Sequence, residues 1–122
     1  MLKFAIPVLH VSDSRAAEDF FKKMGFRARF AYRLDESRPD PCYMGVERDG
    51  VPLHLSSFSG DGVSGGVVYL AVEDVDALHR ELVEKGVPIH LEPVDQTWGN
   101  REMYVKDADG NSIRFIQEGA AS

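Results

Sequence analysis

Residues 8–17 read VLHVSDSRAA and residues 69–78 read YLAVEDVDAL, and these two stretches decide the fold. Each begins with a mostly apolar run, which is typical of a strand, and continues with an acidic residue that can cap a following helix. Both predicted helices end at a glycine, and these residues, Gly25 and Gly86, are 61 positions apart, which is half of the 122-residue chain. The sequence is therefore an internal repeat of two halves.

Each half predicts the order strand, helix, strand, strand, strand. In the first half the expected strands are 4–11, 26–32, 42–47 and 51–57, with the helix after Asp13 or Ser14. In the second half they are 67–72, 89–93, 102–106 and 112–117, with the helix over 75–85. A Gly/Ser-rich hinge, 59–66, separates repeat 1 (1–58) from repeat 2 (67–122). We expect an α+β fold in which curved mixed sheets enclose a cavity.

Composition limits the location and the partners of the protein. With 43% hydrophobic and 28% charged residues the chain is typical of a folded globular domain. A formal net charge of -6 and the lack of a basic stripe disfavour nucleic-acid binding. No apolar run reaches the ~20 residues of a membrane span, and the N-terminus does not resemble a secretion signal. The single cysteine, Cys42, cannot form an internal disulfide, so we expect a cytoplasmic protein.

The two halves, with DADGNSIRF at 107–115 closing the second, resemble the vicinal oxygen chelate superfamily. This superfamily includes glyoxalase I, extradiol dioxygenases, fosfomycin resistance enzymes and bleomycin resistance proteins. Residues 96–102, QTWGNRE, resemble the QPWG stretch of the bleomycin resistance branch. The resemblance spans about residues 4–117 and is more specific for fold than for function.

The metal enzymes of this superfamily take ligands from the first and last strands of each half. The resemblance places these positions at Ile6, His54, Val67 and Arg114. A catalytic divalent ion needs about three ligands from His, Glu, Asp or Cys, and only His54 qualifies. Cys42 has no neighbouring base, and no nucleophile motif is present. We therefore expect no metal, no other cofactor and no catalytic residue.

Bleomycin resistance proteins bind the drug without chemical change, in a groove between two chains where aromatic rings stack on its flat bithiazole. The resemblance gives such stacking roles to Phe30, Tyr43 and Trp98, although Phe30 also suits a core position and Trp98 a dimer interface. His54 lies between two leucines, so we expect it in the cavity opposite the repeat-related Arg114. Weaker candidates for the cavity wall are Ser56, Tyr69 and Met103.

The leading hypothesis is a metal-free homodimer that sequesters a bleomycin-type antibiotic or another flat small molecule. Dimerisation would cover open sheet edges, by exchange of residues 1–11 or of a whole half about the glycines of 60–66. Basic residues near the expected groove oppose a strongly cationic ligand; they are Arg29, Arg33 and Arg38.

Two alternatives remain open. One is a glyoxalase-like enzyme with His54 as base and Arg114 as oxyanion or carboxylate partner. The other is a protein-binding or regulatory module with an occluded cavity.

Overall fold

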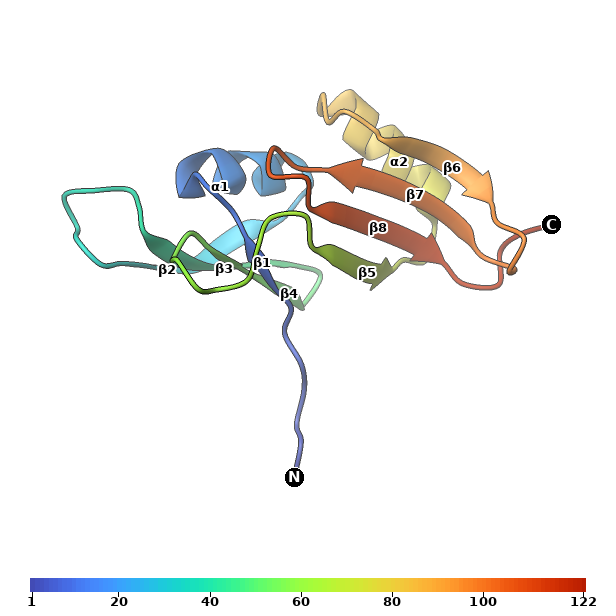
Figure 1. Ribbon diagram of the computed structural model, residues 1–122. Coiled ribbons are helices and arrows are strands. Elements are labelled where there is room, and N and C mark those ends of the chain that lie inside the picture. The colour runs from blue at the N-terminus through green and yellow to red at the C-terminus, as the bar shows by residue number, and fades with distance from the viewer. The chain divides into compact units, whose positions relative to one another are not determined.

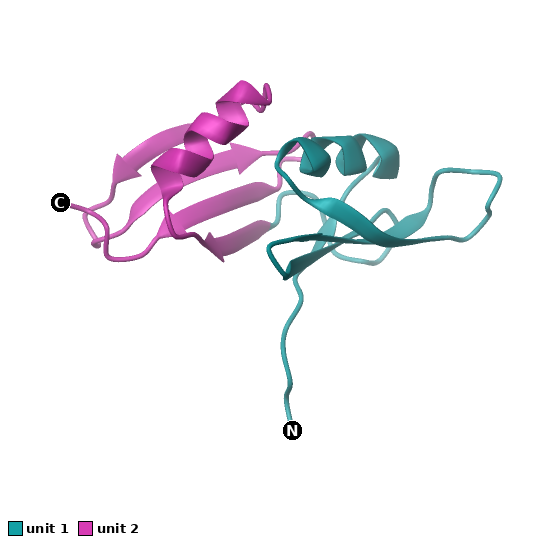
Figure 2. Cartoon of the chain, turned by 180° about the vertical axis from the view of Figure 1, so that it is seen from behind, with its two compact units in different colours: residues 1–66 teal, residues 67–122 magenta.

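The computed structural model describes residues 1–122, which divide into two compact units, 1–66 and 67–122 (Figure 2). Unit 1 contains β1 (Val8–His10), α1 (Ser14–Lys23), β2 (Arg27–Arg33), β3 (Cys42–Arg48) and β4 (Val51–Ser56). Unit 2 contains β5 (Val67–Ala71), α2 (Val75–Glu84), β6 (Leu91–Asp95), β7 (Arg101–Lys106) and β8 (Ser112–Gln117) (Figure 1). The predicted α+β fold of two βαβββ repeats is confirmed.

Each unit forms one four-stranded mixed sheet with the same topology. Sheet A has the order β1-β4-β3-β2, and sheet B has the order β5-β8-β7-β6. In both, the first strand is parallel to the last strand of its unit, and the other neighbours are antiparallel. Val8 pairs with His54 in sheet A as Tyr69 pairs with Arg114 in sheet B, so the repeat extends to individual residues.

The two helices begin in the same way, at the acidic residues that the repeat predicts. The Asp13 Oδ1 accepts a hydrogen bond from the backbone N–H of Ala16 at 3.0 Å, and the Asp74 Oδ1 accepts one from Ala77 at 3.0 Å. Such an N-cap stabilises a helix by about 1 kcal/mol. Neither helix is long and apolar enough to cross a membrane.

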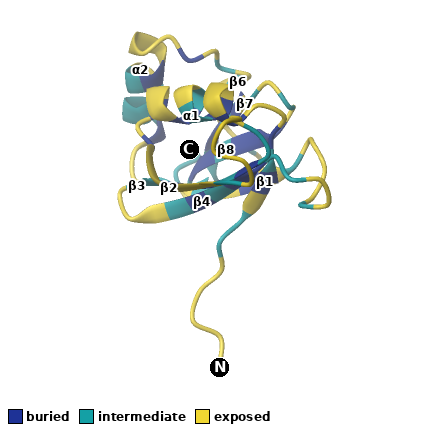
Figure 3. Cartoon of the chain, turned by 90° about the vertical axis from the view of Figure 1, so that its left-hand side faces the viewer, coloured by how far each residue is buried: buried dark blue, intermediate teal, exposed yellow.

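Each helix packs on one face of the sheet of its own unit. Along β4, Leu53 and Leu55 are buried and alternate with the half-buried His54, so the leucines lie toward α1. Figure 3 shows this buried layer in dark blue. In unit 2 the residues of the corresponding layer are Leu82, Met103, Val105, Ile113 and Phe115. Complete burial of one such side chain contributes roughly 1.5–3 kcal/mol.

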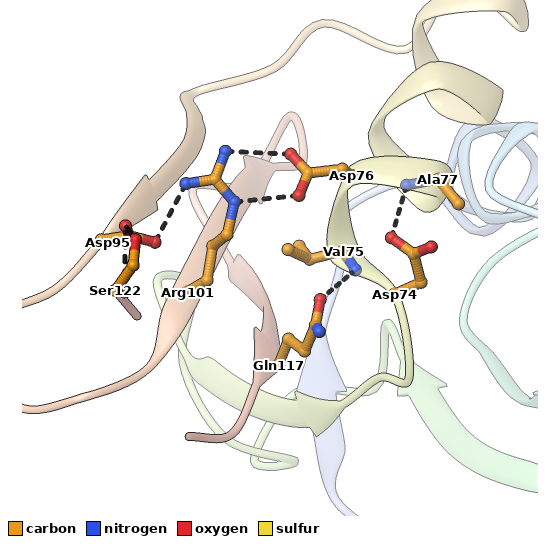
Figure 4. Close-up of polar contacts among 8 residues, drawn as sticks. All are labelled: Asp74, Val75, Asp76, Ala77, Asp95, Arg101, Gln117 and Ser122. Carbon is orange, nitrogen blue, oxygen red and sulfur yellow. Dashed lines mark hydrogen bonds and ion pairs between the residues drawn. The ribbon is translucent and has the colours of Figure 1, made fainter. Parts of the chain in front are cut away.

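Polar contacts fix α2 to sheet B (Figure 4). The Arg101 guanidinium donates from Nε and Nη2 to the two carboxylate oxygens of Asp76 at 2.9 and 3.0 Å, and from Nη1 to Asp95 at 3.0 Å. The backbone N–H of Val75 donates to the Gln117 Oε1 at 3.0 Å. Because Asp76 and Val75 are on α2, these bonds also show that Arg101 lies on the α2 side of β7.

The first strand is shorter than predicted. The sequence predicts a strand over 4–11, but β1 begins at Val8. The apolar residues Met1, Leu2 and Phe4 are 119%, 102% and 77% exposed. Figure 3 shows the N-terminal segment in the colour of exposed residues. The last ladder bond runs from the His54 N–H to the Pro7 carbonyl at 3.0 Å. The next bond along β4 would need an N–H from Pro52, which has none.

Candidate binding faces

A β-bulge in β2 decides which way its aromatic side chains point. Ala28 pairs with Val46, but Phe30 pairs with Gly45, so Arg29 is the extra residue. Strict alternation would place Phe30 beside Ala28 on the α1 side of the sheet. The bulge reverses this, and Phe30 and Tyr32 lie on the face opposite α1. We call this face the open face of sheet A; its residues are Val8, Phe30, Tyr32, Tyr43, Gly45, His54 and Ser56.

Three rings meet on the open face of sheet A. Phe30 and Tyr43 are stacked with centroids 6.3 Å apart and an angle of 11° between their planes. The His54 ring meets both edge to face, at 5.3 Å from Phe30 and 5.2 Å from Tyr43. Phe30 is 47% exposed even in this cluster. An exposed ring held by two others presents a flat apolar surface at little entropic cost.

Gly45 provides the space that Phe30 occupies. A Cβ atom built on Gly45 would lie 2.3 Å from the Phe30 Cε1, far inside van der Waals contact. Phe30 therefore lies directly over the backbone of β3 at Gly45 and contacts His54 on β4. Only glycine at position 45 is compatible with this arrangement of the ring.

A hydrogen bond orients the His54 imidazole. The Tyr43 hydroxyl lies 2.8 Å from the His54 Nδ1. Burial, followed by the negative charge of Asp61, raises the pKa of Tyr43 above its usual value, so the phenol keeps its proton at neutral pH. The contact fixes the orientation of the imidazole, and it leaves Nε2 as the ring nitrogen that does not contact Tyr43.

Ser56 has a structural role at the end of β4. Its side chain is fully buried, and its Oγ donates to the Asp61 Oδ2 at 2.7 Å. The same oxygen accepts the backbone N–H of Phe58 at 3.1 Å. These bonds fold the following turn, in which Phe58 stacks on Tyr32 with centroids 6.1 Å apart. The Ser56 hydroxyl is thus committed to protein partners.

Unit 2 carries a related but more polar face. Tyr69, Arg114 and Tyr104 are neighbours across β5, β8 and β7. The Arg114 Cζ lies over the Tyr104 ring, 4.5 Å from its centroid. We call this side of the sheet, opposite α2, the open face of sheet B; its residues are Tyr69, Leu91, Glu102, Tyr104, Ser112 and Arg114.

Carboxylates hold the aromatic residues of this face. The buried Glu102 accepts from the Trp98 Nε1 at 2.7 Å and from the Tyr104 hydroxyl at 2.5 Å. Glu118 accepts from the Tyr69 hydroxyl at 2.7 Å. These hydrogen bonds to carboxylates are the main reason that the pKa values of Tyr104 and Tyr69 are raised. Trp98 remains 62% exposed although its N–H is bonded.

The structure groups most of the sequence-predicted site residues, each within its own unit. Phe30, Tyr43 and His54 come together in unit 1. In unit 2, Tyr69 and Arg114 share the open face of sheet B, and Trp98 is bonded to Glu102 of that face. Met103 lies elsewhere, because it shares the α2 side of β7 with Arg101 and its side chain is completely buried. Sequence reasoning missed Gly45, Glu102 and Tyr104; alternation along β7 predicts that the last two share a face.

The residues present do not fit a divalent metal ion of the kind the superfamily implies. No group of three or more His, Cys, Asp or Glu residues is arranged to hold one. His54 uses its Nδ1 on Tyr43, and its counterpart in unit 2 is the cationic Arg114. Neither unit offers the set of about three donors that a catalytic ion requires.

Comparisons with known proteins confirm the predicted superfamily. A family model described as "Glyoxalase superfamily protein" matches residues 1–121. A glyoxalase-related enzyme from Clostridium phytofermentans is 25% identical with a TM-score of 0.78, over 97% of this chain and 96% of that chain. A bleomycin-binding protein complexed with bleomycin is 24% identical with a TM-score of 0.76, over 96% of this chain and 99% of that chain. None of the curated proteins matches the sequence significantly.

Proposed function

Because the chain belongs to the glyoxalase superfamily, we propose that it is a metal-free binding protein that sequesters a bleomycin-type antibiotic, or another flat small molecule, in the cytoplasm. The observation that carries this proposal is the ring cluster on the open face of sheet A. Phe30 is 47% exposed, yet Tyr43 and His54 hold it in one position. A fixed, exposed ring is suited to stack on a flat ligand.

The open face of sheet B supports the same proposal. Trp98 is 62% exposed, and its indole N–H is fixed by Glu102. Tyr69 is 52% exposed and fixed through its hydroxyl by Glu118. Large rings that are exposed but held by hydrogen bonds are typical of surfaces that bind a ligand or a partner.

We propose in addition that the protein is a homodimer. Residues 1–4 include three exposed apolar side chains that have no strand partner in their own chain. A second copy that receives this segment would remove the apolar surface from water and extend a sheet edge. Exchange of a whole half about the glycines of 60–66 is the other way to form such a dimer.

Isothermal titration of metal-free and copper-loaded bleomycin into the full chain tests the proposed function. We expect saturable heat near one drug per chain, and loss of that heat in Trp98→Ala. The exposed Val63→Ala, in the linker between the units, is the matched control and should bind normally. Absence of saturable heat with both forms of the drug would refute bleomycin binding.

The second candidate function is a glyoxalase-like enzyme in which His54 is the base. The contact between the Tyr43 hydroxyl and the His54 Nδ1 favours it, because a base needs a fixed orientation. Arg114 would then stabilise an oxyanion or bind a substrate carboxylate. Turnover that disappears in His54→Ala, with no metal found by elemental analysis, would support this alternative over sequestration.

A further inference from the structure

Arg114 forms no ion pair within its own unit. It lies on β8, an inner strand of sheet B, and its side chain is half-buried. Its contacts within unit 2 are the Tyr104 ring under Cζ and a long hydrogen bond of 3.4 Å from Nε to the Ser112 Oγ. Nη1 and Nη2 therefore have donor hydrogens without an acceptor from sheet B.

The nearby carboxylates are occupied by other partners. Glu102 accepts from Trp98 and Tyr104, and Glu118 accepts from Tyr69. Arg101, on the other face of the same sheet, shows the contrast, because it forms ion pairs with Asp76 and Asp95 at 2.9 and 3.0 Å. Neither Glu102 nor Glu118 forms an ion pair with Arg114, so its outer N–H groups are left to water or to a ligand.

The surroundings of Arg114 define the kind of ligand. Contact with the Tyr104 ring uses the face of the guanidinium and leaves its N–H edge available. That edge matches the two oxygens of a carboxylate, which it can bind with two parallel hydrogen bonds. Tyr69 is opposite Arg114 on the neighbouring strand and is 52% exposed, so its ring is available to the rest of the ligand.

We propose that the open face of sheet B binds planar aromatic carboxylates, with Arg114 as the residue that receives the carboxylate. This inference rests on the proposed function in one respect, namely that the open faces bind flat small molecules. It goes further in that it makes the ligand a planar aromatic anion and gives Arg114 this contact whether or not His54 acts as a base. Arg114 thus gives this face a local preference for an anionic ligand, although the net charge of the whole chain is -6.

The test is an NMR titration of the full ¹⁵N-labelled chain with benzoate and with its uncharged analogue benzamide. Trp98 is the one tryptophan, so its indole N–H gives a single assignable signal, and it shares Glu102 with Tyr104. We expect benzoate to shift this signal saturably and to bind at least about tenfold more tightly than benzamide. Arg114→Gln should reduce benzoate affinity by at least about tenfold. Arg80→Gln, which removes an exposed arginine from α2, should not change it.

Equal affinity for benzoate and benzamide, unchanged benzoate binding in Arg114→Gln, or no saturable shift would each overturn the proposal. If Arg114→Gln does not fold, Arg114→Lys keeps the charge without the planar fork, and we expect weaker benzoate binding there too. Titration of bleomycin into the same samples distinguishes the proposed antibiotic binding from the proposed carboxylate site at Arg114. Benzoate binding without bleomycin binding would refute the antibiotic and retain the anion site.

Discussion

His54 and Arg114 occupy the same position in the two sheets. Each lies on an inner strand beside the first strand of its unit, His54 opposite Val8 and Arg114 opposite Tyr69, and these two partners are 61 positions apart in the repeat. On its other side, His54 is opposite Gly45, and Arg114 is opposite Tyr104. One repeat thus presents an imidazole at this position, and the other presents a guanidinium.

Phe30→Ala should abolish most ligand stacking without unfolding the protein. The ring is 47% exposed, so its loss removes little core packing. It contacts both Tyr43 and His54, however, and the ligand would lose the central ring of the cluster. We expect bleomycin affinity to fall by about tenfold or more in isothermal titration. Unchanged affinity would place the ligand away from sheet A.

Gly45→Ala should displace Phe30. The new Cβ would lie 2.3 Å from the Phe30 Cε1, so the ring must move, at a cost of about 1–3 kcal/mol in the free energy of unfolding. In a Phe30→Ala background the same change should cost less than about 0.5 kcal/mol, because the clash is gone. Urea unfolding of the four proteins measures this coupling. Equal costs in both backgrounds would mean that Phe30 does not rest on Gly45.

Much of the fold was predictable because it is encoded locally. Asp13 and Asp74 cap their helices as expected, and the strand Ser112–Gln117 has the predicted bounds. Alternation along β4 also placed His54 correctly between two buried leucines. These features depend on side-chain period and on capping, which neighbouring residues determine.

Features that depend on pairing between strands were less visible. The bulge at Arg29 turns Phe30 to the open face, and its position is known only when β2 is aligned with β3. The pairing of the first strand with β4 does not continue before Pro7, because Pro52 on β4 has no backbone N–H to donate. The contacts of Phe30 with Tyr43 and His54, and of Arg114 with the Tyr104 ring, likewise depend on how neighbouring strands are aligned.

Arg101→Gln should destabilise the protein, and by more at pH 7 than at low pH. Hydrogen bonds from Arg101 hold the pKa values of Asp76 and Asp95 below their usual value. Because the folded pKa lies below the unfolded one, this stabilisation is present above about pH 4 and is lost as the pH falls through the folded values. Urea unfolding at pH 7 and at low pH checks this, with the exposed Arg15→Gln on α1 as the control. A deficit that does not depend on pH would exclude the ion pairs as its cause.

Removal of residues 1–6 should convert a dimer into a monomer. The deleted segment contains Met1, Leu2 and Phe4, which are exposed, and it ends before Pro7, whose carbonyl accepts the His54 N–H. Light scattering of the full chain should give twice its mass of 13.6 kDa, and the truncated chain should give the mass of one chain with an unchanged circular dichroism spectrum. A full chain that is monomeric would refute the dimer. A truncated chain that stays dimeric would favour exchange of a whole half, because the association would not then depend on the N-terminal segment.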